Sequence, residues 1–200
     1  MFWGQSLRAA DASHSEQIKW GNESVFNEEH NTLGLFSGVL GGQIVLAGGT
    51  SDDYSRWGRN AVCLSENAGF ALYEDVLSKP LAYGASITLS DGILCIGGRD
   101  SSQCYEDVFF VTMQQGKLNV SEDWPPLPFP LSNAAGALLD NKVYLFGGRK
   151  SVSPSRLSDS FFVLDLSNKS RGWKELPGYP GCVREDAILV VQNNGVSGGL

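Results

Sequence analysis

A sixteen-residue pattern recurs along this chain at a nearly constant interval, and that interval restricts the fold more than any other feature. In its clearest copy, Asn133–Gly148, two short apolar runs flank an Asp-Asn turn and end in paired glycines. Tyr83–Gly98 repeats the pattern with a Ser-Asp-Gly turn, and Phe36–Gly49 gives a third copy. The glycine pairs begin 49 and 50 residues apart. A fixed period of this size indicates a repeat architecture.

The whole unit repeats, and not only its hairpin. Trp124 and Trp173 lie 49 residues apart, each shortly before a Leu-Pro step. A further strand pattern lies between the glycine pair and the tryptophan, as at Asp107–Val111. Each unit therefore holds four strands in up-and-down order, which is the blade of a β-propeller.

The repeat predicts an all-β fold of about three and a half four-stranded blades. The units span, approximately, residues 33–79, 80–130, 131–180 and, in part, 181–200. The third unit is expected to contain a long loop, Arg149–Asp159, and the fourth a first strand, Ala187–Val191, with Gly198–Gly199 in the turn after it. Residues 1–30 are expected to form an N-terminal segment, in which Gln17–Trp20 has a strand pattern suited to closing the ring. Because propellers close with four to eight blades, we expect the chain to be part of a longer protein with a six-bladed ring.

The charge of the chain excludes one class of partner. A net charge of −7 would repel nucleic acid and anionic membranes. The sequence has no run of 18 apolar residues, so we expect no membrane-spanning helix. Met1–Arg8 lacks a basic region followed by an apolar core, so it is not expected to be a secretory signal. Whether the full-length protein works in the cytoplasm or the periplasm is left open.

The cysteines and acidic pairs point to no metal and no cofactor. The four cysteines form no Cys-x-x-Cys pair and have no histidine neighbours. Cys63 and Cys95 lie in apolar strand patterns and are expected to be buried thiols. Cys104 and Cys182 lie in loops of neighbouring units, where a disulfide is an open alternative. Asp52–Asp53 is expected to be a solvated loop and not a metal site.

The topology of a blade predicts where a ligand would bind. The loop after the second strand and the segment before the next first strand emerge at the same end of an up-and-down blade. The predicted mouth residues are therefore Tyr83, Arg99, Asn133, Arg149, Arg184, Glu185 and the loop Asp52–Arg59. Three arginines in an acidic protein form a positive patch that suits a carboxylate. We predict that Tyr83, Arg99, Arg149 and Arg184 bind the substrate.

A structural role for these arginines is the alternative. Arg149 could pair with Asp159, or Arg99 with Glu106, and so only hold the loops in place. The Glu185-Asp186 pair is not expected to act jointly in acid–base chemistry, because neighbouring strand residues point to opposite sides. The sequence has no motif of a hydrolase or of a phosphate-binding loop.

Several phrases resemble kelch repeats: the apolar run ending in Gly-Gly, the later strand, and the tryptophan before Leu-Pro. More narrowly, Pro80–Ser86 and Gly92–Gly98 resemble the cyclically permuted mutarotase branch related to the N-acetylneuraminate epimerases. Further resembling phrases are Phe36–Gly38, Val45–Gly49, Leu127–Pro128 and Trp173–Pro177 continuing to Arg184. The resemblance covers approximately residues 30–200 and implies a kelch-type β-propeller.

This resemblance implies an isomerase that accelerates the interconversion of N-acetylneuraminate (sialic acid) anomers, with a small sugar acid as partner. In the family, a glutamate after a blade's glycine, with an arginine a few residues on, is thought to do the chemistry. Here Thr50, Arg99 and Arg149 follow the glycine pairs, so no glutamate matches and the catalytic residue is expected beyond Leu200. The alternative is a kelch module that binds a protein or peptide without catalysis. A copper-radical oxidase lacks support, since no set of cysteine and tyrosine fits it. Catalysis by the 200-residue chain alone and its oligomeric state are left open.

Overall fold

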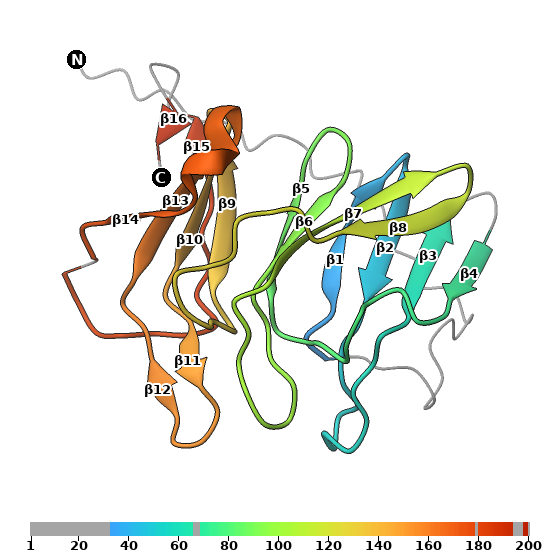
Figure 1. The fold of residues 1–200 in the computed structure, drawn as a ribbon, viewed down its shortest axis with the longest axis horizontal. Helices are drawn as coiled ribbons and strands as arrows, with labels where there is room; N and C mark the ends of the chain where they lie inside the picture. Colours follow the sequence, from blue (N-terminus) through green and yellow to red (C-terminus); the bar gives the residue numbers. More distant parts are fainter. Residues whose placement is uncertain (1–32, 66–68, 179, 194–197, 200) are drawn as a thin grey trace, which may run out of the picture.

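The strands predicted by the repeat form three four-stranded antiparallel sheets in the part of the chain that the computed structural model describes, residues 33–65, 69–178, 180–193 and 198–199 (Figure 1). The first blade holds β1 (Phe36–Leu40), β2 (Gln43–Ala47), β3 (Ala61–Ser65) and β4 (Gly69–Tyr73). The second holds β5 (Ala85–Thr88), β6 (Ile93–Ile96), β7 (Val108–Gln114) and β8 (Lys117–Ser121). In both, each strand pairs with the next along the chain, as up-and-down order requires.

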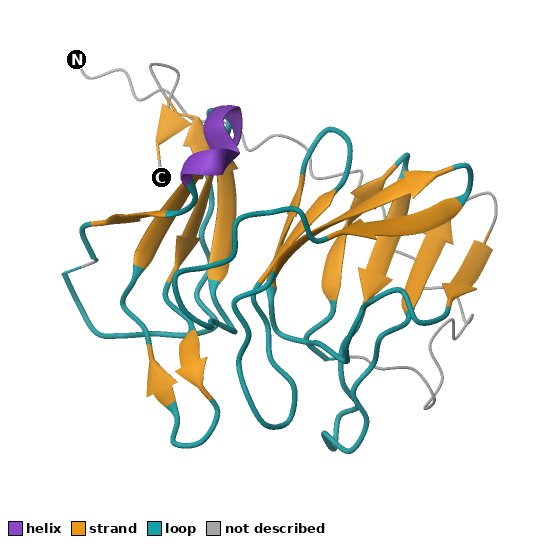
Figure 2. Ribbon diagram, viewed as in Figure 1, coloured by secondary structure: helices purple, strands orange, loops and turns teal. Residues whose placement is uncertain are grey.

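The third blade keeps this order and carries two insertions. Its strands are β9 (Ala135–Leu139), β10 (Lys142–Phe146), β13 (Phe161–Asp165) and β14 (Lys174–Leu176). Where the sequence predicted only a long loop, β11 (Arg149–Ser151) and β12 (Arg156–Leu157) form a small hairpin. A short 3-10 helix, η1 (Leu166–Arg171), follows β13 at the other end of the blade (Figure 2). The side chain of Asp165 caps this helix by accepting from the Ser167 N–H.

The second blade is apolar on both faces, which explains why its strands are continuous apolar runs. Side chains of neighbouring residues in a strand point to opposite faces. Ile93 and Cys95 of β6 therefore pack against the first blade, while Leu94 and Ile96 pack against the third. All four are buried. The described residues thus form two cores, one at each junction between blades, and the second blade contributes to both.

The inner strands of neighbouring blades lie close enough to bond directly. The Ser37 N–H donates to Ser86 Oγ at 3.1 Å, and the Val39 N–H donates to Thr88 Oγ1 at 3.2 Å. A Cβ on Gly38 would lie 2.6 Å from the Ile93 side chain, so only glycine allows this approach. These contacts fix the position of the first blade relative to the second around their common axis.

Two predictions for the C-terminal part were wrong, and others are untested. Ala187–Val191 was expected to be a strand, but the structure assigns none there, and the side chain of Ile188 is 89% exposed. The glycine pair expected in a turn instead forms β16 (Gly198–Gly199), which pairs with β15 (Gln192–Asn193). A strand needs a hydrogen-bonded neighbour, and here the pairing begins one residue after the predicted strand ends. The pattern at Gln17–Trp20 and the N-terminal segment lie outside the described residues.

Along the described ranges, no helix has the length and apolar character needed to cross a membrane.

Candidate functional site

The glycine pairs bring three loops to one end of the molecule, the lower end in Figure 1. In each pair, the N–H of the second glycine donates to a main-chain carbonyl of the following unit. These bonds run from Gly49 to Leu81 (2.9 Å), from Gly98 to Leu131 (2.8 Å) and from Gly148 to Arg184 (2.8 Å). A Cβ on the first glycine would lie 2.2 to 2.6 Å from the same carbonyl oxygen, so this position requires glycine. The loops that follow the three glycine pairs must therefore emerge at the same end of the molecule.

A second set of main-chain bonds links the units around this end. The Tyr83 N–H donates to the Gly34 carbonyl (2.7 Å), the Asn133 N–H to the Tyr83 carbonyl (2.7 Å) and the Asp186 N–H to the Asn133 carbonyl (3.0 Å). All four residues have positive φ, between 53° and 65°. Such backbone is uncommon outside glycine and clusters at functional sites. We call Gly34, Tyr83, Asn133 and Asp186 the mouth ring.

Arg99 lies among three aromatic rings at this mouth. The centre of its guanidinium is 4.6 Å from the ring centroid of Tyr83, 5.1 Å from that of Trp57 and 5.9 Å from that of Tyr54. Its NH1 group donates to the Asp100 carbonyl at 3.3 Å, but its Nε is buried and has no hydrogen-bond partner. A buried donor without a partner is costly, so an acceptor that reached Arg99 Nε would remove that cost.

The loop that carries Arg99 is held by Asp100. One carboxylate oxygen accepts from the N–H groups of Ser102 (2.7 Å) and Gln103 (2.9 Å), and the other accepts from the Tyr105 hydroxyl (2.5 Å). Burial raises the pKa of Asp100, but the hydrogen bonds from Tyr105, Ser102 and Gln103 outweigh it and lower the pKa to about 2. The carboxylate is therefore ionised at neutral pH, and it keeps the loop in one conformation.

Tyr83 contributes a neutral hydroxyl. Burial, and then a hydrogen bond of 3.4 Å to the Tyr54 hydroxyl, raises the pKa of Tyr83 to about 12. The phenol therefore stays protonated and can donate a hydrogen bond. The sequence placed the loop Asp52–Arg59 at the mouth but did not single out Tyr54 and Trp57. Their spacing across one turn could have suggested a shared aromatic face.

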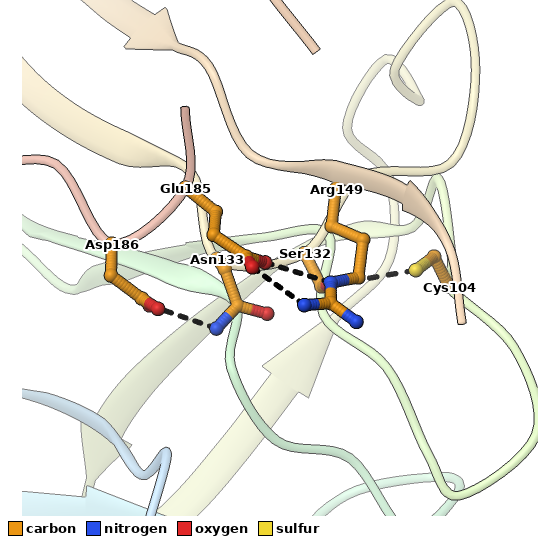
Figure 3. Close-up of polar contacts among 6 residues, drawn as sticks. All are labelled: Cys104, Ser132, Asn133, Arg149, Glu185 and Asp186. Carbon is orange, nitrogen blue, oxygen red and sulfur yellow. Dashed lines mark hydrogen bonds and ion pairs between the residues drawn. The ribbon is translucent and has the colours of Figure 1, made fainter. Parts of the chain in front are cut away.

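Arg149 differs from Arg99 because a carboxylate of the protein already binds its guanidinium. Its Nε donates to one oxygen of Glu185 at 2.7 Å and its NH2 group to the other at 2.5 Å (Figure 3). The hydrogen bonds from Arg149 lower the pKa of Glu185, and those to Glu185 raise the pKa of Arg149. The structural alternative from the sequence named Asp159 as the partner of Arg149, which was wrong. Among the ion pairs of the described residues, Glu106 does not bind Arg99 either.

Asn133 and Asp186 form the next contact along the mouth ring. The Asn133 Nδ2 group donates to Asp186 Oδ1 at 2.8 Å (Figure 3). The Asn133 Oδ1 atom is buried without a hydrogen-bond partner. Glu185 and Asp186 therefore contact different residues, although neither lies in a strand as the sequence argument assumed. Asn133 Oδ1 and Arg99 Nε are the two buried side-chain polar atoms without partners within the described ranges, and both lie at this mouth.

Arg99 and Arg149 both lower the pKa values of neighbouring groups at the mouth. Arg99 adds to the lowering of the Glu185 pKa, and both Arg99 and Arg149 act on the thiol of Cys104. Arg184 differs. Its carbonyl accepts the Gly148 N–H at the mouth, and the residue is exposed and lines a groove together with Glu185. The structure thus brings Arg99, Arg149 and Tyr83 together, while the Arg184 side chain donates to the Cys182 carbonyl at 3.4 Å.

The cysteines are free thiols. Cys63 and Cys95 are buried, as predicted from their apolar strands. Cys104 is also buried, its Sγ 3.4 Å from Ser132 Oγ, and burial raises the pKa of its thiol. Cys182 is exposed, so the disulfide left open by the sequence does not form. In the part of the chain that the structure covers, no three His, Cys, Asp or Glu residues gather as a metal site would require.

Comparison with known proteins agrees with this fold. A model of the kelch motif matches residues 130–177, which form most of the third blade. The N-acetylneuraminate epimerase of Vibrio cholerae is 31% identical over 90 residues, which cover 45% of this chain and 22% of that protein. That of Yersinia pestis (strain Pestoides F) is 32% identical over 71 residues, which cover 36% of this chain and 16% of that protein. A kelch domain-containing protein of Vibrio cholerae is 33% identical over 70 residues, covering 35% of this chain and 18% of that protein.

The fold likeness extends further than the sequence likeness. A solved structure titled "Structure of YjhT" matches with a TM-score of 0.64 at 10% identity, and the match covers 82% of this chain and 63% of that one. The chain thus spans less than two thirds of the length of each of these relatives.

Proposed function

Because the chain consists of kelch-repeat propeller blades with relatives among the N-acetylneuraminate epimerases, we propose that the full-length protein binds N-acetylneuraminate at the mouth and accelerates interconversion of its anomers. The observation that carries this proposal is the unpartnered Nε of Arg99, buried beside three aromatic rings. A sugar acid offers both groups that such a site lacks, a carboxylate oxygen and a ring with apolar C–H faces.

Arg99 is the better carboxylate ligand of the two neighbouring arginines. A guanidinium binds a carboxylate most strongly through two parallel hydrogen bonds. The fork of Arg149 already makes two such bonds to Glu185, so a substrate would have to displace that residue. Arg99 donates one long hydrogen bond to a carbonyl, and its buried Nε has no acceptor to be displaced. Its charge is held in place by Tyr83 and Trp57 in cation–π contacts.

A second function, binding without catalysis, is favoured by one observation. Anomer interconversion moves a proton between the anomeric hydroxyl and the ring oxygen, and so needs an acid–base group. Thr50, Arg99 and Arg149 follow the three glycine pairs, where the resemblance to mutarotases calls for a glutamate. If no other blade of the full-length protein supplies that group, the protein would bind a carboxylate at the same mouth and leave the anomers unchanged.

The test measures binding and catalysis on the full-length protein. We expect NMR exchange between the anomers of N-acetylneuraminate to be faster than in buffer, and calorimetry to show binding. In Arg99→Met, affinity should fall about 10- to 100-fold, because a charge-assisted hydrogen bond is lost. The control Arg171→Met changes the same residue type in η1, exposed at the opposite end of the third blade, and should leave affinity unchanged. Binding without faster exchange would support the second function, and no binding would refute the proposal that this mouth binds N-acetylneuraminate.

A further inference from the structure

The orientation of the Asn133 side chain is fixed by its neighbour. The Asp186 carboxylate can only accept hydrogen bonds, so the Asn133 Nδ2 group must be the atom that faces it, at 2.8 Å. The main-chain N–H and carbonyl of Asn133 are both used in the mouth ring, by Tyr83 and Asp186. The Oδ1 atom is the remaining polar atom of this residue, and it is buried with no partner.

The two unpartnered atoms have opposite polarity. Arg99 Nε can only donate a hydrogen bond, and Asn133 Oδ1 can only accept one. The two residues are close neighbours along the mouth: Arg99 pairs with Ala82, and the carbonyl of the next residue, Tyr83, accepts the Asn133 N–H. An anion without a hydroxyl would satisfy Arg99 and leave Asn133 unpaired. A ligand that places a carboxylate and a donor side by side would satisfy both.

We propose that Asn133 determines specificity by accepting a hydrogen bond from the hydroxyl on the carbon that bears the ligand's carboxylate. This inference rests on the proposed function, because in N-acetylneuraminate that hydroxyl is the anomeric one. Asn133 Oδ1 then holds the reacting hydroxyl while Arg99 holds the carboxylate. Asp186 acts through Asn133, as a positioning residue that keeps the amide oxygen turned away from its own carboxylate.

The backbone offers a variant that removes the side chain without straining the fold. Gly34 occupies the position of Asn133 in the first blade, with φ of 65° against 54°. Glycine adopts this conformation readily, so Asn133→Gly should fold. The matched control is Asn141→Gly, which makes the same change at a residue with φ of 59° in the exposed turn between β9 and β10, at the other end of the blade.

The experiment is a cycle of two proteins, unmodified and Asn133→Gly, and two ligands, with Asn141→Gly as a third, control protein. Binding is measured by calorimetry on the full-length protein. The ligands are N-acetylneuraminate and its 2-deoxy analogue, in which hydrogen replaces the anomeric hydroxyl. The unmodified protein and Asn141→Gly should bind the analogue about tenfold more weakly than the sugar, because the analogue leaves the acceptor unpaired. Asn133→Gly should bind the two ligands equally.

The outcomes separate this inference from the function on which it rests. The inference is wrong if Asn133→Gly lowers the affinity for both ligands by the same factor. It is also wrong if the unmodified protein binds both ligands equally, because Asn133 then does not contact that hydroxyl. The proposed function survives either result, since N-acetylneuraminate still binds. If neither ligand binds the unmodified protein, the proposed function and this inference both fail.

Discussion

Arg99 and Arg149 occupy equivalent places after a glycine pair, yet their side chains are in different states. Glu185 binds both arms of the Arg149 fork, whereas aromatic rings surround Arg99 and leave its Nε without an acceptor. The repeat predicts where each arginine stands, but not what it binds. The partner of Arg149 lies 36 residues further along the chain, and only folding shows that its carboxylate reaches the fork.

The Arg149–Glu185 pair should make stability depend on pH. The folded-state pKa of Glu185 is lowered from its ordinary value of 4.5 by the hydrogen bonds from Arg149. The pair therefore stabilises the fold above pH 4.5, and this contribution is lost as pH falls through the folded-state pKa. We expect Glu185→Gln to lower the free energy of unfolding by about 1 to 2 kcal/mol at pH 7. Both charge-assisted hydrogen bonds weaken in this variant, and the two groups are only partly exposed.

Urea unfolding of this variant at a series of pH values tests the prediction. The difference from the unmodified chain should shrink as the pH is lowered below 4.5. Glu175→Gln, on the exposed side of β14, makes the same chemical change away from the mouth and should cost little at any pH. An equal loss from Glu185→Gln at neutral and acidic pH would show that packing, and not ionisation, accounts for it.

The elements differ in how clearly the sequence specifies them. The inner hairpins lie where the sequence predicted them, because short apolar runs flank tight turns and end in glycine pairs. The β11–β12 hairpin was missed, because its residues are polar and show no alternation. The η1 helix was missed as well, although Asp165 two residues before Ser167 is a cap signal that could have indicated it.

The glycine pairs are the element on which the mouth depends. Gly97 and Gly116 both have positive φ, 62° and 75°, but a Cβ on Gly97 would lie 2.2 Å from the Leu131 carbonyl oxygen, and one on Gly116 would meet nothing within 4 Å. We expect Gly97→Ala to lower the free energy of unfolding by about 3 to 5 kcal/mol and Gly116→Ala to lower it by about 1 kcal/mol. Urea unfolding measures both. Equal costs would mean that backbone conformation alone, and not the approach of the next blade, requires glycine.

At the scale of the whole molecule, each junction between blades is a separate core, and the outer face of the third blade is left apolar. Val183, Ile188 and Val190 are 46%, 89% and 64% exposed, and the groove beside them is lined by Phe146 and Phe161. Exposed apolar patches of this kind favour association. The sequence predicted the apolar pattern of this segment but not its exposure, because burial depends on what packs against it.

This patch should govern association of the 200-residue chain. Ile188→Lys should leave the free energy of unfolding within about 0.5 kcal/mol, because the side chain is almost fully exposed. It should also shift the sedimentation profile toward the monomer. Ser170→Lys adds the same charge on an exposed residue of η1 and should leave the profile unchanged. If both variants shift the profile alike, net charge and not the patch controls association.

The mouth ring has a consequence for how such a site can diversify. Gly34, Tyr83, Asn133 and Asp186 share one backbone conformation and carry a hydrogen atom, a phenol, an amide and a carboxylate. A main-chain hydrogen bond connects each of them to the next, and a side-chain bond also links Asn133 to Asp186. The side chains at Tyr83, Asn133 and Asp186 can therefore change while the main-chain bonds persist, whereas a Cβ on Gly34 would lie 2.8 Å from the Tyr83 ring. A single substitution at one of these positions would thus change which groups the rim offers, and so which molecule it can bind.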